Sequence, residues 1–249
     1  MIKKLTKQEM EHHLQEKHTL SMLSDYIKEL VYGGIDGIVT TFAVVAGFSG
    51  ASLGSQSTVV PVISVLLFGI ANLFADGLSM GLGNYLALRT EKSVYRKEKA
   101  KEEYEVVHSK EAEMAETKFL LMEKGFTDEQ AQTLTEIYSQ NPTYWVEFMM
   151  NYELEMPNPE GTNPMVNGMI TFVSFCLFGA VPLLPYLFKT EIYDTFYLSC
   201  IATLIALGVL GYLRSRVTGR SMIKSILETV LIGSVAAFVA YFVGTLFRH

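Results

Sequence analysis

Two carboxylates lie inside stretches of this sequence that are otherwise apolar. Asp36 falls within residues 27–48, and Asp76 falls within residues 59–88. A charged side chain at the centre of a bilayer costs about 2.5–3.5 kcal/mol on insertion scales, so such a residue usually faces a partner or a pathway. We therefore interpret both acids as functional. The alternative is a protonated or hydrogen-bonded acid that only ties helices together.

The residues around Asp76 repeat at helical spacing. Asn72, Asp76, Met80 and Asn84 recur every four residues, so amide, carboxylate and thioether groups would follow one helix face. Asn72 and Met80 therefore join the two acids as candidate lining of a transport pathway. By contrast, we expect Glu29, near the end of its apolar stretch, to be solvated at the membrane interface.

Pairs of glycines flank both acids. The first pair is Gly33 and Gly37, and the second is Gly77 and Gly81. Small residues four apart let helices approach closely. We expect the tightest helix packing beside the carboxylates, either between two subunits or within one.

A second group of candidate ligands lies in residues 89–165, which hold 16 Asp and Glu against nine Lys and Arg. At about 100° per residue, the glutamates of its first helix fall within an arc of roughly 80°. A later helix adds two methionines and a glutamate at i,i+3 and i,i+4 spacing. Carboxylate and thioether ligands suit a borderline transition ion better than Mg²⁺ or Ca²⁺. The predicted metal ligands are Glu98, Glu102, Glu105, Glu113, Glu116, Met149, Met150 and Glu153. The alternatives are a solvated acidic face and methionines that serve only as core.

The elements that must position these residues are membrane helices. The 249-residue chain is 49% hydrophobic, with a mean hydropathy of +0.25. A helix needs about 20 apolar residues to span a bilayer, where every backbone group must be satisfied internally. Five stretches qualify: 27–48, 59–88, 166–188, 195–213 and 225–247. We predict an all-α integral membrane protein with five transmembrane helices and a helical metal-binding insert between spans two and three.

The basic residues predict how the chain is oriented. Eighteen of the 20 Lys and Arg lie in residues 1–28, 89–165 and 214–224, and basic loops stay in the cytoplasm. The predicted parts are a cytoplasmic arm (1–26), spans one and two (27–88), a cytoplasmic insert (89–165) and spans three to five (166–249). Its expected surroundings are the lipid bilayer, and nothing in the charge pattern indicates nucleic-acid binding.

The insert should consist of three helices. No Pro or Gly interrupts residues 84–124, so span two should continue as one unbroken helix to Lys124, with Gly125 as its stop. Thr127 is a candidate N-cap for a helix that ends at Ser139. A third helix should cover residues 143–155.

Three segments resemble the vacuolar iron transporter family, and the chain looks like a prokaryotic-type member. They are GGIDGIVTTFAVVAGFSGA (33–51), ANLFADGLSMGLGNYLALRTE (71–91) and WVEFMMNYE (145–153). The resemblance implies a homodimer that exports Fe²⁺, often also Mn²⁺, from the cytoplasm in exchange for protons. Asp36 and Met80 match the family's pathway residues. The family's cytoplasmic metal-binding residues match Glu102, Glu105, Glu113, Glu116, Met149, Met150 and Glu153.

One departure concerns the pathway. The plant-type pattern has a glutamate where this chain has Asn72 and a glycine where it has Asp76. We hypothesise that Asp76 replaces the missing glutamate, one helical turn along the same face.

Two other functions remain open at this point. Glu105-Val-Val-His108 and Glu9-Met-Glu-His12 have the Glu-x-x-His spacing of ferritin-like di-iron oxidases. A metal-binding or sensing membrane protein that transports nothing is the other alternative. We expect a transporter and not an enzyme, with no prosthetic group and with Fe²⁺, Mn²⁺, Co²⁺ or Zn²⁺ as the bound and carried ion. We expect a prokaryotic inner membrane in preference to a vacuolar one.

Overall fold

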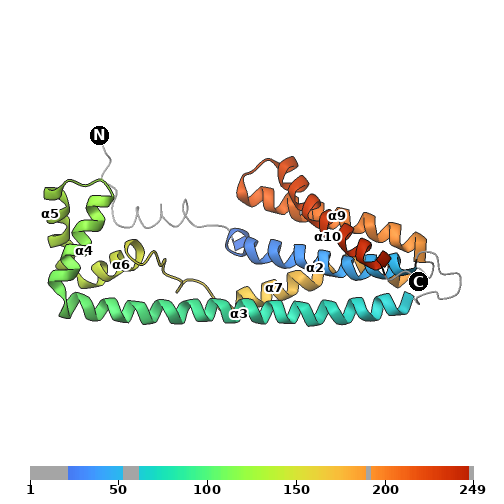
Figure 1. Cartoon of the computed structure of the whole chain (residues 1–249), viewed down its shortest axis with the longest axis horizontal. Helices are drawn as coiled ribbons and strands as arrows, with labels where there is room; N and C mark the ends of the chain where they lie inside the picture. Colours follow the sequence, from blue (N-terminus) through green and yellow to red (C-terminus); the bar gives the residue numbers. More distant parts are fainter. Residues whose placement is uncertain (1–21, 53–61, 189–191, 247–249) are drawn as a thin grey trace. The chain divides into compact units, whose positions relative to one another are not determined.

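The computed structural model describes residues 22–52, 62–188 and 192–246, and these residues form helices and no strand. The chain divides into two compact units (Figure 1). The first comprises Met1–Asn84 and Met165–His249, and the second comprises Tyr85–Pro164. Helix α3 (Val62–His108) contributes residues to both. Most of the predicted N-terminal arm, residues 1–21, lies outside the described residues.

The first unit is a bundle of apolar helices. Besides the first part of α3, it contains α2 (Met22–Ser52), α7 (Pro164–Gly179), η1 (Val181–Leu183), α8 (Leu184–Phe188), α9 (Ile192–Thr218) and α10 (Met222–Leu246). Within the described residues, five stretches are long and apolar enough to cross a membrane, which confirms the predicted number. The third stretch is interrupted at Pro182, where a 3-10 turn joins α7 to α8 because proline cannot donate the helical hydrogen bond.

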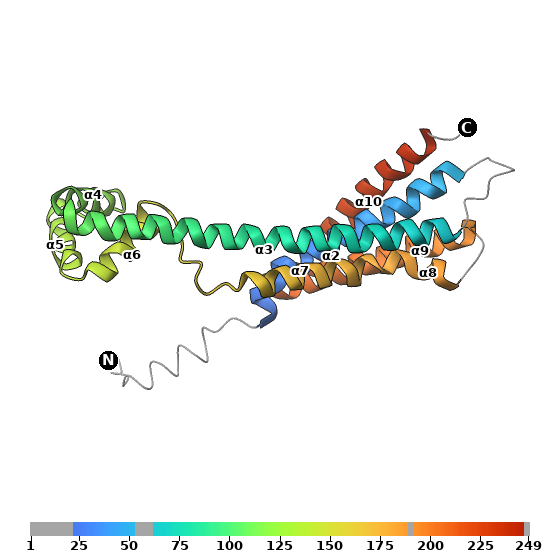
Figure 2. The same cartoon turned by 90° about the horizontal axis from the view of Figure 1, so that it is seen from below.

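The predicted glycine pairs pack against α7 of the same chain. Figures 1 and 2 both show α7 beside α2 and α3. A Cβ atom at Gly33 would lie 2.6 Å from a backbone oxygen of α7, and one at Gly81 would lie 2.8 Å from another. Gly37 meets the carbonyl group of Phe175 in the same way. Of the two alternatives for the pairs, packing within one subunit is therefore the one observed.

The second unit differs from the prediction chiefly in its first helix. Helix α3 ends at His108, and α4 (Lys110–Glu123) begins after Ser109, whose φ of −125° and ψ of 34° are not helical. The predicted unbroken helix to Lys124 is therefore wrong. The break allows Leu121 of α4 and Val106 of α3 to enter one buried cluster around Trp145. Burying several large apolar side chains outweighs the few helical hydrogen bonds lost at a break.

The predicted stop at Gly125 and the predicted bounds of the next helix are confirmed, whereas the last helix ends at Tyr152 and not at residue 155 as predicted. Gly125 follows α4 with a φ of 96°, a left-handed conformation that favours glycine. Thr127 caps α5 (Asp128–Ser139): its hydroxyl accepts from the Gln130 backbone N–H, and its own backbone N–H donates to the Gln130 side-chain oxygen in a capping box. Helix α6 (Pro142–Tyr152) completes the unit, with Asn141 as its N-cap.

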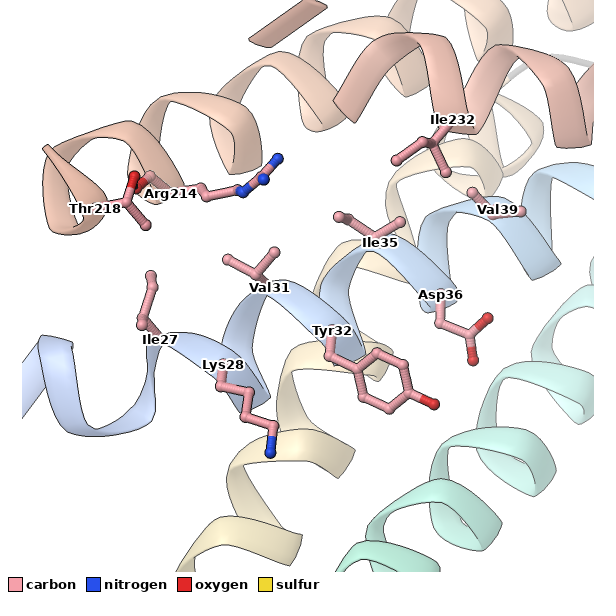
Figure 3. Close-up of a pocket in the computed structure, with 10 residues that line it drawn as sticks. All are labelled: Ile27, Lys28, Val31, Tyr32, Ile35, Asp36, Val39, Arg214, Thr218 and Ile232. Carbon is pink, nitrogen blue, oxygen red and sulfur yellow. The ribbon is translucent and has the colours of Figure 1, made fainter. Parts of the chain in front are cut away.

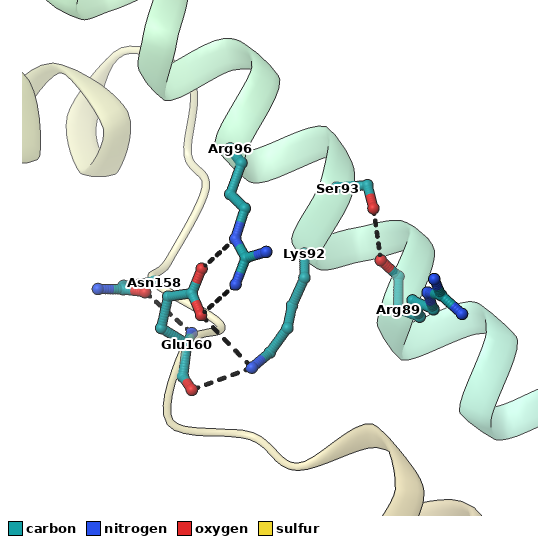
Figure 4. A network of polar contacts seen from close by, with 6 residues as sticks. All are labelled: Arg89, Lys92, Ser93, Arg96, Asn158 and Glu160. Carbon is teal, nitrogen blue, oxygen red and sulfur yellow. Dashed lines mark hydrogen bonds and ion pairs between the residues drawn. The ribbon is translucent and has the colours of Figure 1, made fainter.

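An ion pair ties the chain after α6 to α3. The Arg96 guanidinium donates two hydrogen bonds to the Glu160 carboxylate, at 2.6 and 2.9 Å (Figure 4). Lys92 Nζ donates to the Glu160 carbonyl oxygen at 3.0 Å. Arg96 also holds the pKa of Glu160 below its ordinary value. These contacts fix the end of the linker within the second unit.

Candidate metal centre and membrane acids

The acidic face of α3 in the second unit points into the protein. Glu102 is 1% exposed, whereas Tyr104 and Val107 on the opposite face are 60% and 66% exposed. Glu113 of α4 is 4% exposed. An ordinary amphipathic helix would bury its apolar residues and leave its acids in water. The solvated acidic face therefore does not describe Glu102 and Glu113.

Two groups of carboxylates meet around Glu113. Oxygens of Glu102, Glu105 and Glu113 all lie within 4.8 Å of one another, and oxygens of Glu113, Glu116 and Glu153 do the same. On an unbroken helix, residues 105 and 113 would be separated by eight steps, or about 12 Å along the axis. The break at Ser109 brings these carboxylates together, and Glu153 joins them from the C-terminal end of α6.

Burial and mutual repulsion raise the pKa of three of these carboxyl groups. Burial, followed by the charges of Glu153 and Glu105, raises the pKa of Glu102 to about 7. Burial, followed by Glu102 and Glu116, raises the pKa of Glu113 to about 7. The pKa of Glu153 is raised in the same direction, chiefly by burial. One oxygen of Glu102 and one of Glu113 are buried without a hydrogen-bond partner in the described part of the chain. A divalent cation would supply the missing partner and relieve the repulsion.

Both predicted thioethers are fully buried. Met149 and Met150 of α6 belong to the core around Trp145. The Met149 sulfur accepts a hydrogen bond from the hydroxyl of Thr117, which follows Glu113 by one turn of α4. The two methionines are therefore core residues, and Met149 also lies about one helical turn before Glu153 of the cluster.

Two predicted or alternative ligands do not join the cluster. Glu98 lies outside both carboxylate groups, 3.8 Å from Lys97 Nζ. The ring of His108 stacks on Tyr104, and its Nδ1 lies 2.9 Å from the Tyr104 carbonyl oxygen. The Glu-x-x-His pattern at Glu105 thus does not bring its histidine to the carboxylates. The second such pattern, at residues 9–12, lies outside the described residues.

In the first unit, the two acids of the apolar bundle lie on α2 and α3. Figure 3 shows the Asp36 carboxylate pointing from α2 toward α3, and Asp36 and Asp76 interact electrostatically. Asp36 is exposed in the single chain and borders a groove that also includes Tyr32 and Arg214. Asp76 is half-buried.

The other residues of the predicted α3 face divide between two environments. Met80 is half-buried one turn after Asp76. Asn72 lines a different groove, between α2, α3 and α10. Asn84 is turned toward α7, where its amide donates to the Thr171 hydroxyl at 2.9 Å. The four-residue spacing therefore leaves Asp76 and Met80 one turn apart on α3, whereas Asn72 and Asn84 lie in other surroundings.

Sequence reasoning misjudged Glu29. It is 7% exposed and buried against α7, where the Asn167 amide donates to its carboxylate at 2.7 Å. Glu29 lies four residues before Gly33, so it shares the helix face on which Gly33 and Gly37 pack against α7. Its spacing from these glycines was the available signal for burial.

The sequence is similar to that of known proteins over most of its length. The VIT family model matches residues 27–245. "Vacuolar iron transporter 1" of Arabidopsis thaliana is 32% identical over 98% of this chain and 94% of its own length. "Vacuolar iron transporter" of Toxoplasma gondii is 35% identical over 94% of this chain and 78% of its own. "Vacuolar iron transporter 1" of Oryza sativa is 32% identical over 92% of this chain and 88% of its own.

Proposed function

This chain belongs to the VIT family, and we propose that it exports Fe²⁺ from the cytoplasm in exchange for protons. It is a multi-pass membrane protein, and members of the family are transporters of metal ions and not enzymes. The di-iron oxidase alternative therefore has no support from the family, and the orientation of His108 gives it none either.

The proposal rests mainly on the carboxylate cluster of the second unit, in which Glu113 belongs to both groups. It combines buried carboxylate oxygens that lack partners among the described residues with a nearby thioether. This ligand set would accept Fe²⁺ and also Mn²⁺, Co²⁺ and Zn²⁺. In our proposal, Glu102, Glu105, Glu113, Glu116, Met149, Met150 and Glu153 collect the ion on the cytoplasmic side. Their negative charge raises the local concentration of cations.

The proposed pathway across the membrane uses Asp36, Asp76 and Met80, with Asn72 beyond them. The interaction between the two carboxylates within an apolar bundle supports it. A carboxylate binds either a proton or a metal ion, so the two compete for one position. That competition is sufficient for proton-coupled exchange. Asp36 is exposed in the single chain, as a pathway completed by a second copy in a homodimer would require.

Flux in proteoliposomes tests this function. Wild type should move Fe²⁺ and, in the opposite direction, protons reported by an enclosed pH dye. Asp36→Asn should abolish both movements. Glu103→Gln is the matched control, because Glu103 is exposed and lies outside both carboxylate groups.

Each alternative gives a different result in the same assay. Fe²⁺ flux that ignores a pH gradient would contradict proton coupling and leave a uniporter. Metal binding without any flux would contradict transport and favour a metal-sensing protein.

A further inference from the structure

Three fully buried side chains form a hydrogen-bonded chain next to the carboxylate cluster. The Trp145 indole Nε1 donates to the Thr117 hydroxyl oxygen at 2.7 Å. That hydroxyl lies 2.7 Å from the Glu113 carbonyl oxygen and 3.3 Å from the Met149 sulfur. Thr117 is 0% exposed, so water does not compete for these contacts.

The Thr117 hydroxyl has one proton and two acceptors. The indole of Trp145 is a donor only, so it must use a lone pair of the hydroxyl oxygen. The hydroxyl proton can then go to the Glu113 carbonyl group or to the Met149 sulfur. Because Trp145 holds the oxygen in place, rotation of this single hydrogen decides which acceptor is used.

We propose that Thr117 is a positioning residue that holds the Met149 thioether toward the carboxylate cluster and so sets the preference of this site for sulfur-binding ions. The inference rests on the proposed function, because it assumes that the cluster binds metal. Without an ion, the hydroxyl donates to the sulfur and anchors the side chain. When an ion takes the sulfur lone pair, the hydroxyl donates to the Glu113 carbonyl group.

This arrangement affects ions unequally. A thioether adds more to the binding of Co²⁺ or Fe²⁺ than to that of Mn²⁺, which is satisfied by oxygen ligands. Methionine has three rotatable bonds, so an unanchored Met149 side chain would have to be ordered on binding. Loss of the anchor should therefore weaken the sulfur-favouring ions most.

The test is a titration of the full-length protein in detergent with Co²⁺ and with Mn²⁺. Trp145 is the only tryptophan of the chain, so its fluorescence reports on this site alone. We expect Thr117→Val to weaken Co²⁺ binding by about tenfold, the lower end for loss of an outer-shell partner. We expect Mn²⁺ binding to change by less than about twofold, since its affinity depends mainly on the oxygen ligands.

Four further variants separate positioning from simple destabilisation. Thr117→Ser keeps the hydroxyl and should restore the wild-type ratio of Co²⁺ to Mn²⁺ affinity. Met149→Leu should shift that ratio as Thr117→Val does, and the double variant should shift it no further. Thr135→Val is the matched control, because Thr135 is an equally buried threonine on α5, outside this chain of hydrogen bonds.

The outcomes distinguish the two proposals. If wild type binds neither ion, the proposed function fails at its first step and the inference fails with it. If wild type binds both ions and Thr117→Val weakens them equally, or leaves both unchanged, only the inference is overturned.

Discussion

At the scale of single residues, the unusual feature is a set of acids buried against one another. Glu102 and Glu113 lie almost out of solvent, and the adjacent Lys101 pairs with Glu105 on one side of the cluster. Buried like charges are costly unless protons or a cation neutralise them. We therefore expect protons and a metal cation to compete for these carboxylates.

The first prediction concerns metal affinity and pH. Because the pKa values of Glu102 and Glu113 are raised to about 7, a metal ion must displace protons below that pH. Mn²⁺ affinity, measured by calorimetry, should fall steadily as pH is lowered from about 7.5 to 6, with proton release on binding. Glu113→Gln should weaken binding most, since Glu113 belongs to both groups, and should reduce proton release. Glu103→Gln should behave as wild type. A pH-independent affinity would contradict the site.

The same pKa values predict how the metal-free protein responds to pH. Between the ordinary glutamate value of 4.5 and about 7, the folded state binds more protons than the unfolded state. The contribution of these two groups to the stability of the second unit should therefore be greatest below about pH 4.5. It should fall as pH rises to about 7. Thermal unfolding followed by Trp145 fluorescence would measure this, and Mn²⁺ should reverse the loss. An increase in stability across that range would be the opposite of our expectation.

A third prediction concerns the acid that the plant-type pattern lacks. If Asp76 replaces the glutamate missing at Asn72, then Asp76→Asn should lower Fe²⁺ flux as severely as Asp36→Asn, by about tenfold or more. Asn84→Asp adds an acid to the same helix near α7 and should not rescue it. Wild-type flux in Asp76→Asn, with loss of flux in Asp36→Asn, would show that Asp36 acts without this partner.

Among the helices, a break in α3 and the glycines of α2 and α3 determine where the candidate site residues lie. The break at Ser109 turns one acidic helix into two helices whose carboxylates meet. In the first unit, glycines allow the backbones of α2 and α3 to touch α7. Backbone contact of this kind brings α2 and α3 to the same helix and so sets the separation of Asp36 from Asp76.

Substitution of these glycines tests the packing. Gly37→Ala would place a methyl group against the Phe175 carbonyl group, so we expect a loss of about 1–3 kcal/mol, as for overpacked cores. Gly83→Ala is the control, because a Cβ there meets no atom of the described chain within 4 Å. It should leave stability unchanged or raise it by about 0.5–1 kcal/mol, since alanine favours a helix. Thermal unfolding in detergent would measure both, and equal effects would contradict close packing at Gly37.

At the scale of the whole molecule, charge predicts which parts face the cytoplasm. Eighteen of the 20 Lys and Arg lie in three segments separated by apolar spans, and this asymmetry orients membrane proteins. The acidic insert lies in one of those segments, so the proposed metal centre would meet ions on the cytoplasmic side.

Labelling of single cysteines tests this orientation. Cys176 and Cys200 would first be replaced by serine. A membrane-impermeant maleimide should then label Lys110→Cys only after the cells are permeabilised, because Lys110 belongs to the insert. Ser55→Cys, in the connection between the first two spans, should be labelled in intact cells. The reverse pattern would invert the proposed direction of transport.

The class of the fold, the number of spans and the candidate residues of both proposed sites could be predicted from the sequence. These follow from local properties: runs of apolar residues, basic connections, and glycine or capping residues at helix ends. Only the tertiary structure decided that α3 breaks at Ser109, that its acidic face is the buried one, and that Glu29 is enclosed by α7. Helix periodicity states which residues share a face but not which face is covered. What covers a face depends on distant segments such as Trp145 and Asn167, and so on long-range packing.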